Sequence, residues 1–297
     1  MTDIEIYGTG KRVSIPSAWD EMSPGQVQFV FRLYDRCIRG LMSPLEFNVR
    51  VLYHFLGLKR SVGEMVRERV FPERARRKAE NVYRLCEEAL GFLFAPADVS
   101  RGRLCLSFDA LANPLPVARR GLRRPLVGPA DMLSDLTFGE FRHAAVCLDS
   151  FFRTESPRLL DECIAHLYRV RVRSANRAGR RVAPVSARSV GMDTRRAASL
   201  APWQKSLVMM WFSACLKYLQ SGVVAIDGEL VEMSRLFSGD GSGDKGCSWN
   251  DLLIEISKEQ TIGNMERVDE EPLFSIFSIM WHNHKERKRY EKIAKAR

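Results

Sequence analysis

Apolar side chains recur at the three- and four-residue spacing of an α-helix along most of this chain, and start signals precede several of these runs. Ser23-Pro24 and Ser43-Pro44 each combine a capping hydroxyl with a proline suited to the first helical turn. Thr137, with Glu140 three residues on, forms a capping box. The pattern predicts a mainly α fold, a multi-helix bundle of stacked helical hairpins with long loops and at most a short N-terminal strand or hairpin.

Two of the predicted hairpins have similar sequences. Residues 22–53 and 136–168 align so that Ser23 falls on Thr137 and Gly25 on Gly139, and both segments end in Leu-Tyr. The similarity predicts two duplicated units that stack through their apolar faces. Unrelated amphipathic helices also share such patterns, so both interpretations stay open.

Arginine is concentrated in one segment. Nine arginines and a single acid, Asp193, lie between Arg169 and Arg196, with almost no large apolar side chain. Such a composition buries too little apolar surface to offset the entropy lost on ordering, so we expect a flexible loop.

The predicted organisation is an N-terminal helical domain at 1–130 that ends in a Pro/Gly-rich loop, a second helical hairpin at 131–170, the Arg-rich flexible loop at 171–196, and a C-terminal helical region with a basic tail at 197–297.

The longest apolar stretch, from Leu207 to Leu219, is interrupted by Ser213 and Lys217 and is shorter than the ~20 residues that a membrane span needs. The first residues lack the apolar core of a signal peptide. Seven cysteines without a C-x-x-C pair are typical of a reducing compartment. We therefore expect a cytoplasmic protein without a membrane partner, and the sequence leaves its oligomeric state open.

The formal net charge of +10 makes nucleic acid, anionic lipid and acidic proteins candidate partners, although a basic protein can also carry its charge without such a role. Two Arg pairs near residue 120 form a first basic zone. The predicted residues for binding nucleic acid or an acidic partner are Arg171, Arg173, Arg177, Arg180, Arg181, Arg188, Arg195, Arg196, Lys285, Arg287, Lys288 and Arg289.

Motifs for catalysis or metal binding are incomplete. The two histidines of His282-Asn283-His284 diverge on a helix and cannot share a metal. Glu140-x-x-His143 is half of a di-iron motif that has no second copy. The glycine-rich loop at 239–246 places Lys245 where a calcium loop requires glycine, and it lacks the P-loop spacing. We expect no catalytic, cofactor or metal site, and hence no enzyme.

Large apolar side chains of the last two long helices could line a groove for a partner helix, or they could form ordinary core. The candidate groove residues are Trp203, Met209, Met210, Trp211, Phe274 and Trp281.

Several phrases resemble an uncharacterised protein family from prophage-like and tailed-phage regions of Bacteroidetes genomes: PSAWDEMSPGQVQF at 16–29, GPADMLSDLTFGEF at 128–141 and AHLY at 165–168. EQTIGNM at 259–265, before an apolar helix and a charged tail, resembles the end of phage tail-assembly proteins. The resemblance implies a non-enzymatic role in virion morphogenesis in the host cytoplasm, as a tail-assembly chaperone with other phage structural or tail proteins as partners. The alternative is a basic accessory protein that binds nucleic acid non-specifically through the 169–196 loop and the C-terminal tail.

Overall fold

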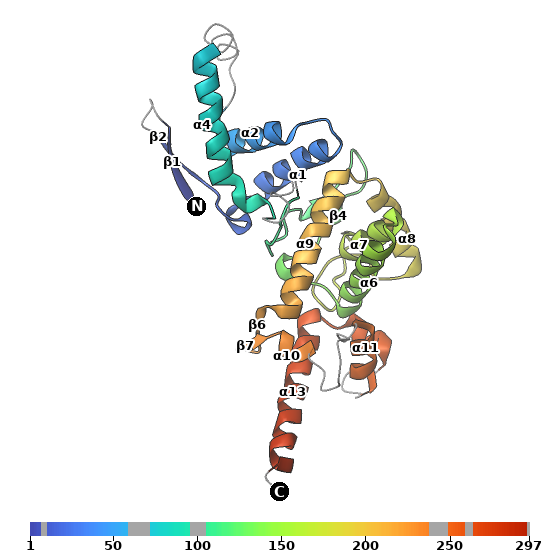
Figure 1. Cartoon of the computed structure of the whole chain (residues 1–297). Coiled ribbons are helices and arrows are strands. Elements are labelled where there is room, and N and C mark those ends of the chain that lie inside the picture. Colours follow the sequence, from blue (N-terminus) through green and yellow to red (C-terminus); the bar gives the residue numbers. More distant parts are fainter. Residues whose placement is uncertain (7–10, 59–71, 96–104, 238–248, 259–263, 296–297) are drawn as a thin grey trace. The chain divides into compact units, whose positions relative to one another are not determined.

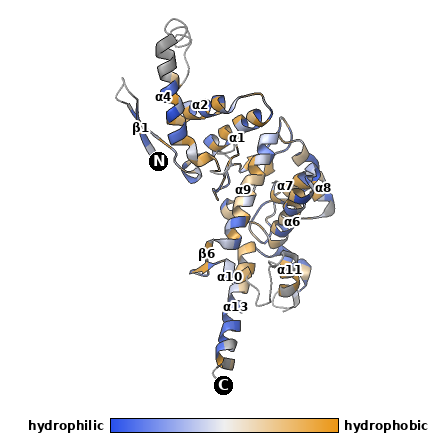
Figure 2. Ribbon diagram, viewed as in Figure 1, coloured by the Kyte–Doolittle hydropathy of each residue, from blue (hydrophilic) through white to orange (hydrophobic). Residues whose placement is uncertain are grey.

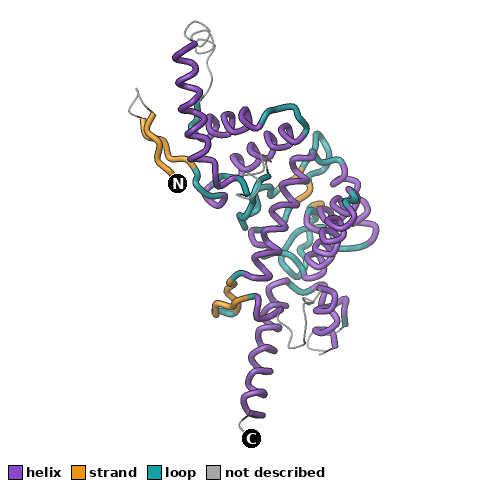
Figure 3. The backbone as a smooth tube through the Cα atoms, viewed as in Figure 1, coloured by secondary structure: helices purple, strands orange, loops and turns teal. Residues whose placement is uncertain are grey.

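The computed structural model describes residues 1–6, 11–58, 72–95, 105–237, 249–258 and 264–295. The chain forms two compact units, Met1–Ala110 and Leu111–Arg297, and each is described by itself. Both are mainly α-helical, which confirms the predicted fold class (Figures 1 and 3). The division between them falls at residue 110, inside the first domain that we predicted at 1–130.

In its described residues, unit 1 has a β-hairpin followed by the three α-helices α1, α2 and α4. Its elements are β1 Thr2–Ile6, β2 Lys11–Ile15, the 3-10 turn Trp19–Glu21, α1 Pro24–Ile38, α2 Pro44–Phe55, α4 Pro72–Leu90 and the 3-10 turn Gly91–Leu93. The buried Trp19 ring lies 4.8 Å from the Phe108 ring and 6.1 Å from the Phe31 ring, between centroids. This aromatic cluster anchors α1 in the core of the unit.

Unit 2 contains the remaining helices and two small sheets. Its elements are β3 Val117–Ala118, β4 Leu126–Val127, the 3-10 turn Asp131–Leu133, α6 Phe138–Thr154, α7 Pro157–Leu167, β5 Arg169–Val170, α8 Ala187–Ala198, α9 Pro202–Ser221, β6 Val223–Ile226, β7 Glu229–Glu232, α10 Ser234–Phe237, α11 Trp249–Lys258, α12 Met265–Glu270 and α13 Leu273–Lys295. The apolar α9 forms much of the core, and Figure 2 shows its hydrophobic residues. Leu207, Trp211 and Leu219 of this helix are fully buried.

The predicted helix starts are confirmed by the cap geometry. The Ser23 hydroxyl accepts from the Gln26 backbone N–H at the start of α1, and Ser43 accepts from Glu46 at the start of α2. Thr137 accepts from the Glu140 backbone N–H, and the Glu140 carboxylate accepts from the Thr137 N–H. Each predicted hairpin is therefore present, as α1–α2 in unit 1 and α6–α7 in unit 2. That they are duplicates stays a prediction.

Strands are more numerous than predicted. The N-terminal hairpin β1–β2 was expected, but a three-stranded sheet β3–β4–β5 and a hairpin β6–β7 are also present. In the second hairpin, Asp227 and Gly228 both have positive φ, at 51° and 82°. This is the turn that Asp-Gly favours between paired strands. We expected no hairpin at this point.

The prediction of a flexible loop at 171–196 is wrong. Residue 171 forms a bridge with residue 182, and α8 begins at Ala187. Val182 and Arg180 are buried, with exposed fractions of 3% and 4%. The ordering comes from ion pairs with other segments, which the local composition does not reveal.

None of the described helices combines the length and apolarity that a bilayer span requires. The last helix, α13, is apolar near Leu273 and hydrophilic further along, as Figure 2 shows. Leu273, Ile276 and Phe277 are buried, whereas Lys288 and Arg289 are exposed.

Candidate functional site

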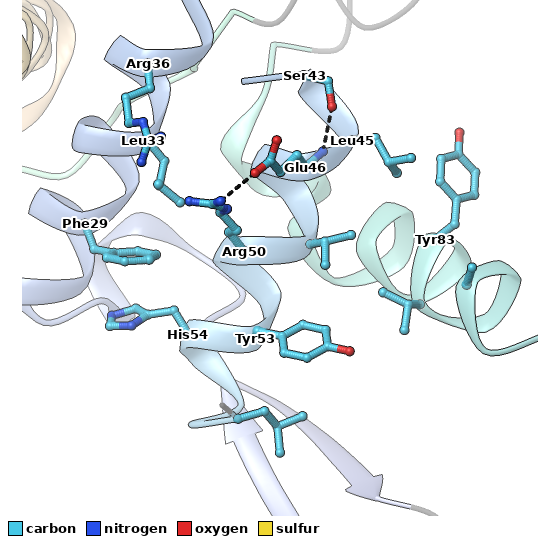
Figure 4. A pocket seen from close by; sticks show the side chains of 14 residues that line it. Phe29, Leu33, Arg36, Ser43, Leu45, Glu46, Arg50, Tyr53, His54 and Tyr83 are labelled. Atoms are coloured by element: carbon cyan, nitrogen blue, oxygen red, sulfur yellow. Dashed lines mark hydrogen bonds and ion pairs between the residues drawn. The ribbon is translucent and has the colours of Figure 1, made fainter. Parts of the chain in front are cut away.

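An open groove lies across the outer face of α2, with α1 and α4 on its two sides (Figure 4). Its volume is about 1040 Å³. Pockets for small ligands usually measure about 300–1,000 Å³, so this groove is at the upper end of that range. The lining residues come from α1, from α2 and the residues flanking it, and from α4: Phe29, Leu33, Arg36, Ser43, Leu45, Glu46, Val49, Arg50, Tyr53, His54, Leu58, Ala79, Val82 and Tyr83.

The sequence of α2 builds the groove because this helix carries two apolar stripes. Phe47 and Val51 are fully buried and hold the helix on the core of unit 1. A second stripe, Leu45, Val49 and Tyr53, recurs every four residues and therefore lies on another face of the same helix. This second stripe lines the groove.

Several apolar side chains around the groove are exposed to solvent. Leu45 is 52% exposed, Tyr83 49% and Leu58 41%. One such side chain in water is ordinary, but here three exposed apolar side chains line one groove. A hydrogen bond to Glu87, four residues further along α4, raises the pKa of the Tyr83 hydroxyl.

The side of the groove between α1 and α2 is aromatic. The rings of Phe29 and His54 stack with centroids 3.9 Å apart and planes 18° from parallel, as Figure 4 shows. Partial burial lowers the pKa of His54, so its imidazole is neutral at pH 7. This wall of the groove is therefore flat and uncharged.

Charge at the groove is mainly positive. Arg36 and Arg50 line it from α1 and α2, and Glu46 is the one acid among the lining residues. The Glu46 carboxylate lies 2.6 Å from the Arg50 guanidinium. A ligand with apolar side chains and acidic flanks would complement this arrangement.

Of the candidate groove residues in the C-terminal helices, Trp211 is a core residue and the others are partly exposed. Trp211 is fully buried in unit 2, and its indole N–H donates to the Leu111 carbonyl at 3.1 Å. The Trp281 indole donates to Glu229 at 2.7 Å, and Phe274 packs edge-on against Phe277. Trp203 and Met210 are partly buried on α9. None of these side chains lines the groove described on α2.

The predicted basic residues divide into buried, paired and exposed groups. Arg180 is buried, Arg177 pairs with Glu271, and Arg196 lies 2.7 Å from Asp193. The exposed residues of the predicted set on and around β5 and α8 are Arg171, Arg173, Arg181, Arg188 and Arg195. In the tail, Lys285, Arg287, Lys288 and Arg289 are all exposed, and the Lys285 amino group lies 3.1 Å from Glu229.

The buried Arg180 acts as a clamp inside unit 2. Its Nη2 donates to the carbonyl oxygens of Val127 and Leu167, and so joins β4 to the end of α7. Its guanidinium also lies 3.8 Å from Glu140 and 3.9 Å from Asp135. Burial raises the pKa of Glu140, while the positive charge of Arg180 opposes that shift. Arg180 is therefore part of the core and cannot contact a nucleic acid.

Arg169 makes a second buried connection. Its Nη2 donates to the Pro184 carbonyl at 2.9 Å and to the Ser189 hydroxyl at 2.7 Å, and Asp193 lies 3.9 Å from its Nε. These contacts attach α8 to β5. Two arginines of the segment whose composition suggested mobility, Arg169 and Arg180, thus hold that segment in place.

The histidine and acid motifs have structural roles. Glu140 completes the cap of α6, and the His143 ring stacks on the His166 ring with centroids 5.1 Å apart. His166 is buried, which lowers its pKa to about 3. Within the described ranges, no three His, Cys, Asp or Glu side chains converge as metal ligands. The glycine-rich loop at 239–246 lies outside the described residues.

Comparisons of the chain with protein-family models, with curated proteins and with solved structures find no match. What the fold and the site define is a mainly α-helical protein with an open apolar groove in its first unit.

Proposed function

We propose that this protein is a non-enzymatic assembly factor that binds an amphipathic helix of a partner protein in the groove across α2. The observation that carries the proposal is the apolar groove itself, with Leu45, Leu58 and Tyr83 left in contact with water. A helix about 10–12 Å in diameter would cover these side chains with its apolar face. The gain is the hydrophobic free energy of the surface removed from water.

Charge favours an acidic helix over a basic one. Glu46 is already paired with Arg50, so these two charges offset each other, and Arg36 of α1 adds a net positive charge to the lining. A glutamate on the flank of a bound helix would therefore meet positive potential on the α1 side of the groove. The resemblance of the C-terminal sequence to phage tail-assembly proteins supports a role in virion morphogenesis, in which the partner is a tail protein held before assembly.

A helical peptide of about 16 residues tests this proposal, with leucines on one face and glutamates on its flanks. We expect it to bind the full chain with a Kd of about 1–50 μM, measured by fluorescence anisotropy. The double variant Leu45→Glu, Tyr83→Glu should weaken binding at least ~10-fold, because it places two acids on the apolar surface.

Two controls make the experiment specific. Leu230→Glu changes a 79% exposed leucine on β7 of unit 2 and should leave the affinity unchanged. A peptide of the same composition with its leucines dispersed around the helix should not bind. Equal binding of both peptides, or equal affinities for the groove variant and the Leu230 variant, would contradict a helix-binding groove.

A further inference from the structure

Arginines from three distant parts of the sequence come together in unit 2. The turn between β3 and β4 contains Arg119, Arg120, Arg123 and Arg124. β4 pairs antiparallel with β5, and Leu126 lies opposite Val170. Because the strands run in opposite directions, β5 leaves the sheet at the end where this turn lies. Arg171, the first residue after β5, is therefore next to the turn.

A hydrogen bond attaches the same turn to α8. The Arg120 guanidinium donates to the Ser199 carbonyl at 2.8 Å, just after the last turn of that helix. Arg195 lies one helical turn before Ser199. We call the six exposed arginines that these contacts gather the guanidinium surface, namely Arg119, Arg120, Arg123, Arg124, Arg171 and Arg195.

No acid neutralises this surface locally. Residues 115–127 and 169–202 contain one acid, Asp193, which is buried beside Arg169 and Arg196. Among the described residues, no carboxylate lies within ion-pair distance of the six guanidinium groups. The same two segments contain no lysine and no aromatic residue.

We propose that the guanidinium surface binds the phosphate backbone of a nucleic-acid duplex. Arginine presents a planar fork of donors that matches two phosphate oxygens, and an all-arginine surface favours this ligand. The two segments that carry the six arginines contain no aromatic residue, so they lack the stacking platforms on which single-stranded ligands depend. This activity goes beyond the binding of a partner helix and belongs to the other unit.

Acidic proteins and anionic membranes fit the surface less well. A stable protein interface has an apolar centre, and a membrane-binding loop inserts several apolar side chains. At the tip of the β3–β4 turn, Leu122 is the one apolar side chain, and it is fully exposed. The surface is otherwise composed of charged groups, which suits the evenly charged backbone of a duplex.

A salt titration of duplex binding tests the proposal. The probe is a labelled DNA duplex of about 20 base pairs, bound to the full chain between about 50 and 200 mM salt. The triple variant Arg119→Gln, Arg123→Gln, Arg124→Gln removes three of the six charges and keeps the Arg120–Ser199 hydrogen bond. We expect it to reduce the slope of log K against log salt by about 2.7, and the affinity at 0.1 M salt by about 100-fold or more.

The matched control is Arg84→Gln, Arg153→Gln, Arg158→Gln, which changes the net charge equally at exposed ion pairs within helices. It should leave the slope within about 0.5 of the native value. Equal losses in the two triple variants would overturn the proposal, because net charge alone would then explain binding. Tighter binding of a single strand than of the duplex would also overturn it.

Vesicles of phosphatidylserine separate a lipid from a nucleic acid. The proposal expects weak vesicle binding and a duplex affinity that Leu122→Ser leaves unchanged. Vesicle binding at least as tight as duplex binding, and lost in Leu122→Ser, would assign the surface to lipid headgroups. Far-ultraviolet circular dichroism confirms that each variant is folded. The Leu45→Glu, Tyr83→Glu variant should keep full duplex affinity, so a failure here is distinct from a failure of the helix-binding groove.

Discussion

Replacing Arg180 by methionine should lower the free energy of unfolding by about 3–5 kcal/mol. The change leaves the Glu140 carboxylate, whose side chain is 2% exposed, without its buried positive neighbour. It also removes the donor shared by the Val127 and Leu167 carbonyls. Urea denaturation followed by circular dichroism measures the loss.

Arg181→Met is the matched control, because Arg181 is the next residue in the chain and is exposed. Its effect should stay within about 0.5 kcal/mol. Glu140→Gln removes the buried charge and keeps an oxygen that can accept from the Thr137 N–H. In that background, Arg180→Met should cost less, by a coupling energy of about 0.5–3 kcal/mol. Equal effects of Arg180→Met and Arg181→Met would contradict the assignment of Arg180 to the core.

Replacing Trp211 by alanine should cost about 3–5 kcal/mol of stability. The indole is fully buried in unit 2, so its removal creates a cavity, and the Leu111 carbonyl loses the donor 3.1 Å away. Trp203→Ala, on the same helix at a partly buried position, should cost no more than about 1.5 kcal/mol. Thermal or urea unfolding of the two variants measures the difference. A stable Trp211→Ala protein with weakened partner binding would restore the alternative in which these side chains line a groove.

Local sequence patterns were sufficient to predict most of the helices. The Ser23 and Ser43 caps and the Thr137–Glu140 capping box each lie at the start of a helix. Such signals depend on atoms within one turn of each other, so they can be recognised without the tertiary structure. The Asp227-Gly228 turn was equally local, with the apolar run Val223–Ile226 before it, and could have been predicted as a hairpin.

The arginine-rich segment could not be predicted in the same way. Its order depends on Glu140 and Asp135, which precede Arg180 by 40 and 45 residues, and on carbonyls of β4 and α7. A composition argument counts every arginine as a solvated charge, whereas Arg169 and Arg180 are buried and paired. The proximity of Arg120 to α8, which carries Arg195, likewise depends on a contact between distant segments, the Arg120–Ser199 hydrogen bond.

The groove on α2 was not predicted, although one of the two features that define it, an apolar stripe on the helix, is visible in the sequence. The stripe of Leu45, Val49 and Tyr53 is visible on α2, but its exposure is not, because any apolar stripe can face the core. The tertiary structure is needed to show which stripe of α2 faces the core. Phe47 and Val51 fill the core, whereas the other stripe faces the groove between α1 and α4. Trp211 of the C-terminal half gave a strong sequence signal for the opposite reason, since it is a core residue.

Site-specific photo-cross-linking, in cells that produce this protein, tests the helix-binding groove most directly. A benzoylphenylalanine in place of Tyr83 lies in the groove, and the same group at Tyr290, a 65% exposed residue of α13, is the control. The predicted result is one protein captured from position 83 alone, with mass spectrometry locating the cross-link on the apolar face of an acidic amphipathic helix. Capture of the same proteins from both positions, or a cross-link at position 83 to a segment without such a face, would contradict the account.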